Sequence, residues 1–139
     1  MNNREKKIIV GNWKMNPPTI MEARRIFGFV KRTAAKIRRA TVVICPPFLF
    51  LSALAQSAKN SRNISLGVQN IFWETSGSYT GEISSMMILN AGAKFAIIGH
   101  SERRALGETD SQIAKKAVLA LKLSGSKLCR PMSKPWTLP

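Results

Sequence analysis

The only histidine of the chain, His100, stands in a segment whose residue types suit acid–base chemistry. It follows the apolar run 95–99 and is followed directly by Ser101 and Glu102. An imidazole can donate a hydrogen bond to a carbonyl group or exchange a proton near neutral pH. A lone histidine is also often a structural residue, and at this point that alternative stays open for His100.

A second polar segment contains Asn12 and Lys14, which come directly after the apolar run 8–11. A lysine can hold an anionic, oxygen-rich ligand as a point charge, and an asparagine amide can donate a hydrogen bond to the same ligand. The alternative is a solvated lysine on the surface. Taken alone, this pair is therefore a weak indication of a binding site.

Both segments follow runs that are typical of strands. The runs lack polar alternation and are bounded by glycine, proline or other turn residues, which is the pattern of strands buried on both faces. We expect four such strands, over 8–11, 41–45, 64–69 and 95–99.

Helical patterns separate these strands. Thr19 and Glu22 have the spacing of a capping box, and the apolar positions that follow continue to Ile37. Thr109 and Gln112 form a second capping box before a helix that reaches Leu123. Two further helices are expected over 48–59 and 84–91.

Four strand–helix units in series predict an α/β fold with a parallel sheet and right-handed crossovers. In such folds, ligands bind at the carboxyl ends of the strands. Asn12, Lys14 and His100 each follow a strand, so we expect them to meet at the same edge of the sheet.

The composition of the chain argues against several other classes of function. The 139 residues contain 22 Lys and Arg against 7 Asp and Glu, a formal net charge of +15. The basic residues are spread along the chain without alternating aromatic residues, which argues against a nucleic-acid-binding protein. No run reaches the roughly 18 apolar residues of a membrane helix. The two cysteines, Cys45 and Cys129, lack metal-ligand spacing, so we expect reduced thiols and no metal site.

Several motifs together resemble the amino-terminal half of triosephosphate isomerase. The resemblance extends from about residue 8 to about residue 123. The motifs are Gly-Asn-Trp-Lys-Met-Asn at 11–16, Cys-Pro-Pro at 45–47, Gln-Asn at 69–70, Gly-Glu-Ile-Ser at 81–84, Ile-Gly-His-Ser-Glu-Arg-Arg at 98–104 and Gly-Glu-Thr-Asp at 107–110. This resemblance implies the first four units of an eight-stranded (β/α) barrel, a TIM barrel, which takes about 250 residues in full.

The resemblance also implies a role for each matching site residue. His100 would polarise the carbonyl of a triose phosphate as a neutral imidazole and shuttle protons between its two oxygens. Lys14 would stabilise the negative charge of the substrate and of the enediolate, and Asn12 would position the substrate. Ser101 and Glu102 would support the site, Glu102 by pairing with or orienting the lysine. The implied reaction, which needs no cofactor and no metal, interconverts dihydroxyacetone phosphate and glyceraldehyde 3-phosphate in glycolysis and gluconeogenesis.

The same resemblance implies a role in dimer formation for the aromatic segment 72–81. In the family this loop enters a pocket of a second subunit, so Thr80 and Tyr79 would lie at the contact of a homodimer in the cytoplasm. The alternative is an Ω-loop packed on its own chain.

Part of the family's pattern has no counterpart in this sequence. No position matches the catalytic glutamate base, and the glycine-rich phosphate loops are also absent. Residues 124–139 fit neither helix nor strand periodicity. We therefore expect residues 1–123 to form half of a barrel and residues 124–139 to be an unrelated, poorly ordered tail. A frameshift, a gene break or a sequence-assembly error would produce such a tail. We expect little activity from this chain alone. The first alternative is a non-catalytic half-barrel, either a pseudogene product or a piece that needs a complementing chain. The second is a basic nucleic-acid-binding protein.

Overall fold

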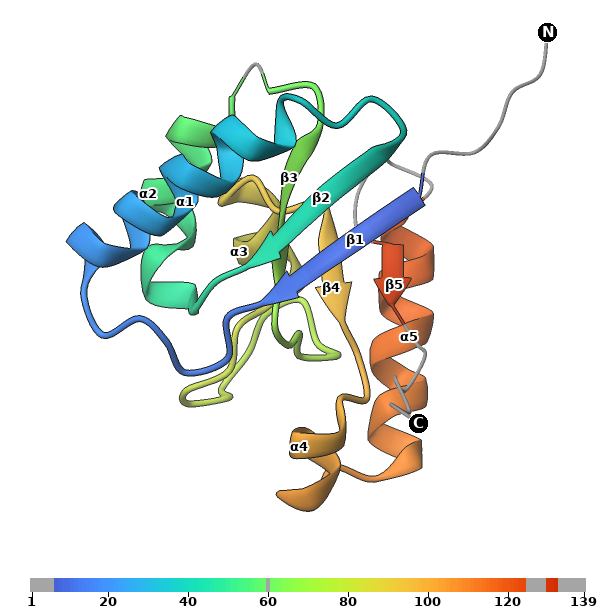
Figure 1. Cartoon of the computed structure of the whole chain (residues 1–139). Helices are drawn as coiled ribbons and strands as arrows, with labels where there is room; N and C mark the ends of the chain where they lie inside the picture. The colour runs from blue at the N-terminus through green and yellow to red at the C-terminus, as the bar shows by residue number, and fades with distance from the viewer. Residues whose placement is uncertain (1–6, 60, 125–129, 133–139) are drawn as a thin grey trace, which may run out of the picture.

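The computed structural model describes residues 7–59, 61–124 and 130–132. Its centre is a parallel sheet with the strand order β1-β2-β3-β4-β5, curled into part of a barrel (Figure 1). The strands are β1 (Lys7–Asn12), β2 (Ala40–Cys45), β3 (Ile64–Val68), β4 (Phe95–Ile97) and β5 (Arg130–Met132). The sheet order follows the chain order, as the predicted series of right-handed units requires.

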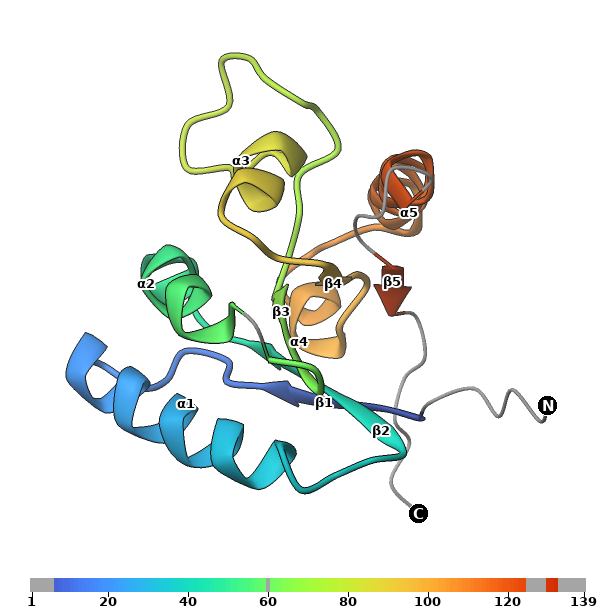
Figure 2. The same cartoon turned by 90° about the horizontal axis from the view of Figure 1, so that it is seen from above.

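The helices lie between the strands in sequence, and most of them cover the outside of the curled sheet (Figures 1 and 2). The short helix 101–105 lies instead beyond the carboxyl end of β4 (Figure 1). They are α1 (Ile20–Ala34), α2 (Phe48–Ala58), α3 (Ser85–Asn90), α4 (Ser101–Ala105) and α5 (Asp110–Ser124). The predicted α/β class and the first four (β/α) units of a TIM barrel are therefore confirmed.

The capping residues define where the helices begin. Thr19 Oγ1 accepts a hydrogen bond from the backbone N–H of Glu22 at the start of α1. Before α5 both bonds of the capping box form: Thr109 N–H donates to Gln112 Oε1 at 2.9 Å, and Gln112 N–H donates to Thr109 Oγ1 at 3.3 Å. Helix α1 ends at Ala34, three residues before the predicted end.

The core has two parts, because alternate residues of a strand face opposite sides of the sheet. Val42 and Ile44 of β2 pack outward in the main core between sheet and helices. Val43 and Cys45 face the inside of the curl and pack with Ile97. Both inward residues are completely buried, and Val10 and Phe95 pack against the same cluster.

Two strand predictions require correction. The prediction of a buried first strand was wrong, since Ile8 and Ile9 are 42% and 50% exposed. The described part of the sheet gives β1 a single neighbour, β2, and leaves its other side uncovered. The prediction that residues 124–139 contain no strand was wrong for Arg130–Met132, which pair in parallel with Phe95–Ile97. The rest of that segment, apart from Ser124 at the end of α5, lies outside the described residues.

Candidate active site

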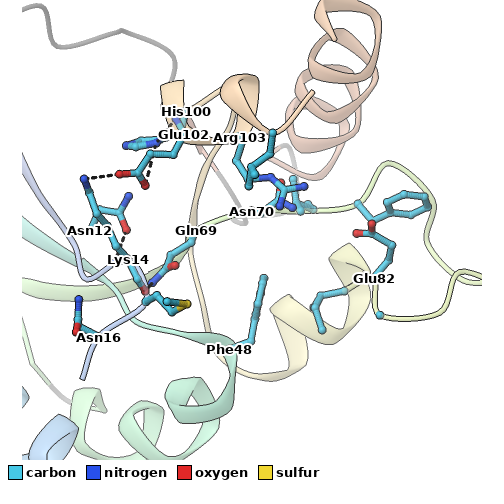
Figure 3. Close-up of a pocket in the computed structure, with 16 residues that line it drawn as sticks. Asn12, Lys14, Asn16, Phe48, Gln69, Asn70, Glu82, His100, Glu102 and Arg103 are labelled. Carbon is cyan, nitrogen blue, oxygen red and sulfur yellow. Dashed lines mark hydrogen bonds and ion pairs between the residues drawn. The ribbon is translucent and has the colours of Figure 1, made fainter. Parts of the chain in front are cut away.

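The polar residues selected from the sequence gather at the carboxyl ends of the strands. A pocket of about 640 Å³ opens there, and its lining includes Asn12, Lys14, His100 and Glu102 (Figure 3). Asn12 is the last residue of β1 and pairs in register with Cys45 of β2, while His100 follows β4. The parallel topology therefore brings residues nearly ninety positions apart in the chain to one edge of the sheet.

Lys14 holds a backbone conformation that is uncommon for a residue with a side chain. Its φ is 56°, in the left-handed region. Two neighbours support this conformation: Asn12 Oδ1 accepts a hydrogen bond from Lys14 N–H at 2.9 Å, and Gln69 Nε2 donates to the Lys14 carbonyl oxygen at 2.8 Å. Strained backbone that neighbours fix in place is concentrated at functional sites in proteins.

His100 forms the amino-terminal cap of α4 instead of lying in an open loop. Its Nδ1 accepts a hydrogen bond from the backbone N–H of Glu102 at 3.2 Å. A nitrogen that accepts this bond carries no proton, so a neutral His100 has its proton on Nε2. Gly99 provides the turn into the helix with a φ of 70°, and a side chain there would also crowd Ile113. This arrangement leaves Nε2–H as the donor that a ligand can use.

Lys14 and Glu102 form an ion pair across the pocket mouth (Figure 3). Lys14 Nζ lies 2.6 Å from Glu102 Oε1, and both side chains are about half exposed. The other oxygen, Oε2, lies 3.7 Å from His100 Nδ1. The hydrogen bond from Lys14 lowers the pKa of the Glu102 carboxyl, and the positive charge of Lys14 lowers it further. Glu102 thus stays ionised at neutral pH and orients the ammonium group.

A buried charged cluster lies behind the pocket. Lys116 of α5 donates to Glu108 and, at 2.7 Å, to Asn70 Oδ1. The Lys116 and Glu108 side chains are only 3% and 4% exposed. Lys116 Nζ also lies 5.9 Å from the ring centroid of Trp73. The cluster therefore joins α5 to the base of the loop that begins at Asn70.

The loop 72–81 is irregular, as expected, and its base is aromatic. The Phe72 ring centroid lies 4.1 Å from that of Trp73 and 4.7 Å from that of Tyr79. Phe72 is buried, whereas residues 74–81 are exposed, and the loop projects away from the sheet (Figure 2). The loop thus has a packed base on its own chain and a tip that contacts solvent.

The structure brings together four of the predicted site residues and separates the others. Asn12, Lys14, His100 and Glu102 line one pocket. Ser101 is exposed in the first turn of α4, and Tyr79 and Thr80 lie in the loop, all three outside the pocket lining. Sequence reasoning did not select Gln69, Asn70 or Arg103, which also line the pocket. Gln69 could have been found, because it is the polar residue at the carboxyl end of the predicted strand 64–69.

Two further structural findings concern other classes of site. Among the described residues, no group of three or more His, Cys, Asp and Glu side chains is placed to hold a metal ion. No described helix is long and apolar enough to cross a membrane.

Comparison with known proteins extends the resemblance to nearly the whole chain. The family model for triosephosphate isomerase matches residues 7–128. Three curated relatives are triosephosphate isomerases. The protein of Moorella thermoacetica is 47% identical over 116 residues, which cover 83% of this chain and 45% of the relative. The protein of Acidithiobacillus ferrooxidans is 44% identical over 119 residues, covering 85% and 45%. The protein of Endomicrobium trichonymphae is 42% identical over 117 residues, covering 84% and 46%. The chain thus spans less than half the length of these relatives.

Proposed function

Because the chain belongs to the triosephosphate isomerase family, we propose that it supplies the residues that polarise the substrate carbonyl in a site for triose phosphates. The reaction would be the interconversion of dihydroxyacetone phosphate and glyceraldehyde 3-phosphate. The observation that carries this proposal is the Lys14–Glu102–His100 arrangement at the carboxyl edge of the sheet. It joins one oriented cation to one imidazole whose Nε2–H is free to donate.

The chemistry of the isomerisation fits these two groups. A proton leaves the carbon beside the carbonyl group, and negative charge develops on the carbonyl oxygen as the enediolate forms. His100 would donate a hydrogen bond from Nε2 to that oxygen, and Lys14 would stabilise its charge. Donors that are already oriented toward a developing oxyanion lower the barrier, because they need no rearrangement during the reaction.

Proton abstraction needs a carboxylate that this arrangement does not supply. Four of the described carboxylates are paired with cations: Glu22, Glu102, Glu108 and Asp110. Glu82 lines the pocket but lies on the side away from His100 (Figure 3). We therefore assign the base to a glutamate of the family that matches no position among these 139 residues. On this proposal the chain binds substrate but has little isomerase activity by itself.

The exposed loop supports a proposal about assembly. The rings of Phe72 and Tyr79 pack together at the base of the loop, and the Tyr79 side chain is still 46% exposed. We propose that Tyr79 and Thr80 contact a second subunit in a homodimer, and that the protein acts in the cytoplasm with glycolysis and gluconeogenesis.

A chimera tests the proposed function directly. Residues 7–123 would replace the matching part of the Moorella thermoacetica relative, and isomerase turnover would be measured in both directions. We expect an active chimera whose kcat falls by about 10²-fold or more in His100→Gln. Lys122→Gln, a change on an exposed part of α5, should leave kcat unchanged. A folded but inactive chimera, or one insensitive to His100→Gln, would overturn the proposal.

A further inference from the structure

Helix α1 presents an exposed face that has no part in the core or in the proposed site. The face, called here the outer face of α1, consists of Met21, Arg24, Arg25, Gly28, Phe29 and Arg32. At 100° per residue these positions lie on one side of the helix. Ala23, Phe27 and Ala34 are buried on the opposite side, against the main core. Figure 2 shows α1 as an outermost element of the molecule.

The outer face combines positive charge with large apolar side chains. Arg24, Arg25 and Arg32 are exposed, and the only acid of the helix is Glu22, 3.9 Å from Arg25. Met21 is 79% exposed and Phe29 is 64% exposed on the same face. Exposed cations continue beyond the helix at Lys36, Arg38 and Arg39.

The charge of this region is not explained by the proposed isomerase site. The chain carries a net charge of +15, and a triose phosphate needs only one or two cations near the pocket. The pocket lies at the carboxyl edge of the sheet, whereas the arginines of α1 are absent from its lining. A positive surface attracts polyanions in general, so charge alone does not identify the partner.

The apolar side chains distinguish between the two main classes of polyanion. A helix that lies on an anionic bilayer places apolar residues in the acyl boundary and its cations among the headgroups. Met21 and Phe29 would gain burial there. On a nucleic acid they would gain little, because contacts to the phosphate backbone are made by charged and polar groups. We propose that the outer face of α1 binds the surface of an anionic phospholipid bilayer.

Vesicle co-sedimentation of the full 139-residue chain tests this proposal. The chain should bind vesicles of phosphatidylcholine mixed with phosphatidylglycerol and should not bind phosphatidylcholine alone. Each cation near an anionic leaflet raises partitioning by roughly fivefold, so Arg25→Gln/Arg32→Gln should weaken binding by up to about 25-fold. Phe29→Ser should weaken it several-fold and, unlike the arginine changes, about equally at low and high salt.

The matched control removes the same net charge elsewhere. Lys94 and Lys122 are exposed outside α1, and Lys94→Gln/Lys122→Gln should change binding by less than about twofold. Circular dichroism checks that every variant keeps its helices. Equal losses in both double variants would overturn the proposal, because binding would then follow total charge. Equal binding to neutral vesicles would overturn it as well, and so would displacement from anionic vesicles by a duplex DNA that the chain binds more tightly.

Discussion

The side-chain amide of Gln69 donates a hydrogen bond to the backbone oxygen of Lys14 at 2.8 Å and another to that of Cys45 at 2.9 Å. One side chain after β3 thus fastens the segment after β1 to the end of β2. The ammonium group of Lys14 therefore depends on a residue that need not touch a ligand itself.

Replacing Gln69 should loosen Lys14 more than it unfolds the protein. Gln69→Leu removes both bonds, but Cys45 O keeps its bond from Trp13 N–H, and water can solvate Lys14 O. We expect a loss of about 1 kcal/mol in the free energy of unfolding, measured with urea. The affinity for dihydroxyacetone phosphate should fall by about tenfold, because the cation moves. Gln56→Leu, on an exposed part of α2, should alter neither quantity. Unchanged affinity in Gln69→Leu would show that Gln69 does not position Lys14.

The Lys14–Glu102 ion pair should make stability depend on pH in the acid range. The pKa of Glu102 is lowered from its ordinary value of 4.5 in the folded state. The contribution of its charge to stability is then fully present above pH 4.5 and is lost as the pH falls through the lowered value. The difference in unfolding free energy between the parent chain and Glu102→Gln should therefore shrink below pH 4.5. A difference that stays constant from neutral pH into this range would contradict the assignment.

Breaking the buried cluster should be far more costly than changing a surface lysine. Lys116→Met removes the hydrogen-bonded cation of the buried Glu108 carboxylate and leaves only Arg103 Nε, 3.8 Å from Glu108 Oε1. It should lower the free energy of unfolding by about 3–5 kcal/mol. Lys122→Met, on an exposed part of the same helix, should have little effect in the same urea titration. The double variant Lys116→Met/Glu108→Gln should recover part of the loss, because it removes the uncompensated charge. A loss below about 1 kcal/mol in Lys116→Met would contradict this, and would show that Arg103 or water compensates the Glu108 carboxylate.

Gly67 lies where the inner face of the sheet is most crowded. A Cβ at this position would stand 2.7 Å from Cys45 Sγ and 3.0 Å from Val43 Cγ1. Gly67→Ala should therefore destabilise the fold by about 1–3 kcal/mol, measured by urea unfolding. Gly28→Ala is the matched control in α1, where the new methyl group meets only Arg32 at 3.6 Å, and it should be neutral or slightly stabilising. Equal stability of both variants would show that the inner face has room to relax.

Local sequence signals predicted the helices and strands well where residues close together in the chain determine the backbone conformation. The Thr109–Gln112 spacing identified the start of α5, because both capping bonds are made between neighbours in the chain. The apolar runs identified β2, β3 and β4, because burial on both faces of a strand requires an unbroken series of apolar residues. The resemblance predicted that Glu102 would pair with or orient Lys14, and the two side chains are hydrogen-bonded across 88 positions of the chain.

Features that depend on distant neighbours were not predictable in this way. The exposure of Ile8 and Ile9 follows from the edge position of β1, which its own residues do not encode. Lys116 resembles any surface lysine of an amphipathic helix, yet Glu108 and Asn70 make its burial possible. The role of Gln69 depends on two carbonyl groups from other strands.

Because His100 is the only histidine of the chain, its imidazole resonances in an NMR spectrum are unambiguous. The most direct measurement is a titration of the chain with dihydroxyacetone phosphate, followed at those resonances, with inorganic phosphate as the control. The account predicts that the neutral form of the imidazole carries its proton on Nε2. It also predicts a saturable shift with dihydroxyacetone phosphate, a smaller shift with phosphate, and loss of the saturable shift in Lys14→Met. His100 resonances that do not respond to dihydroxyacetone phosphate, or that respond equally in Lys14→Met, would contradict it.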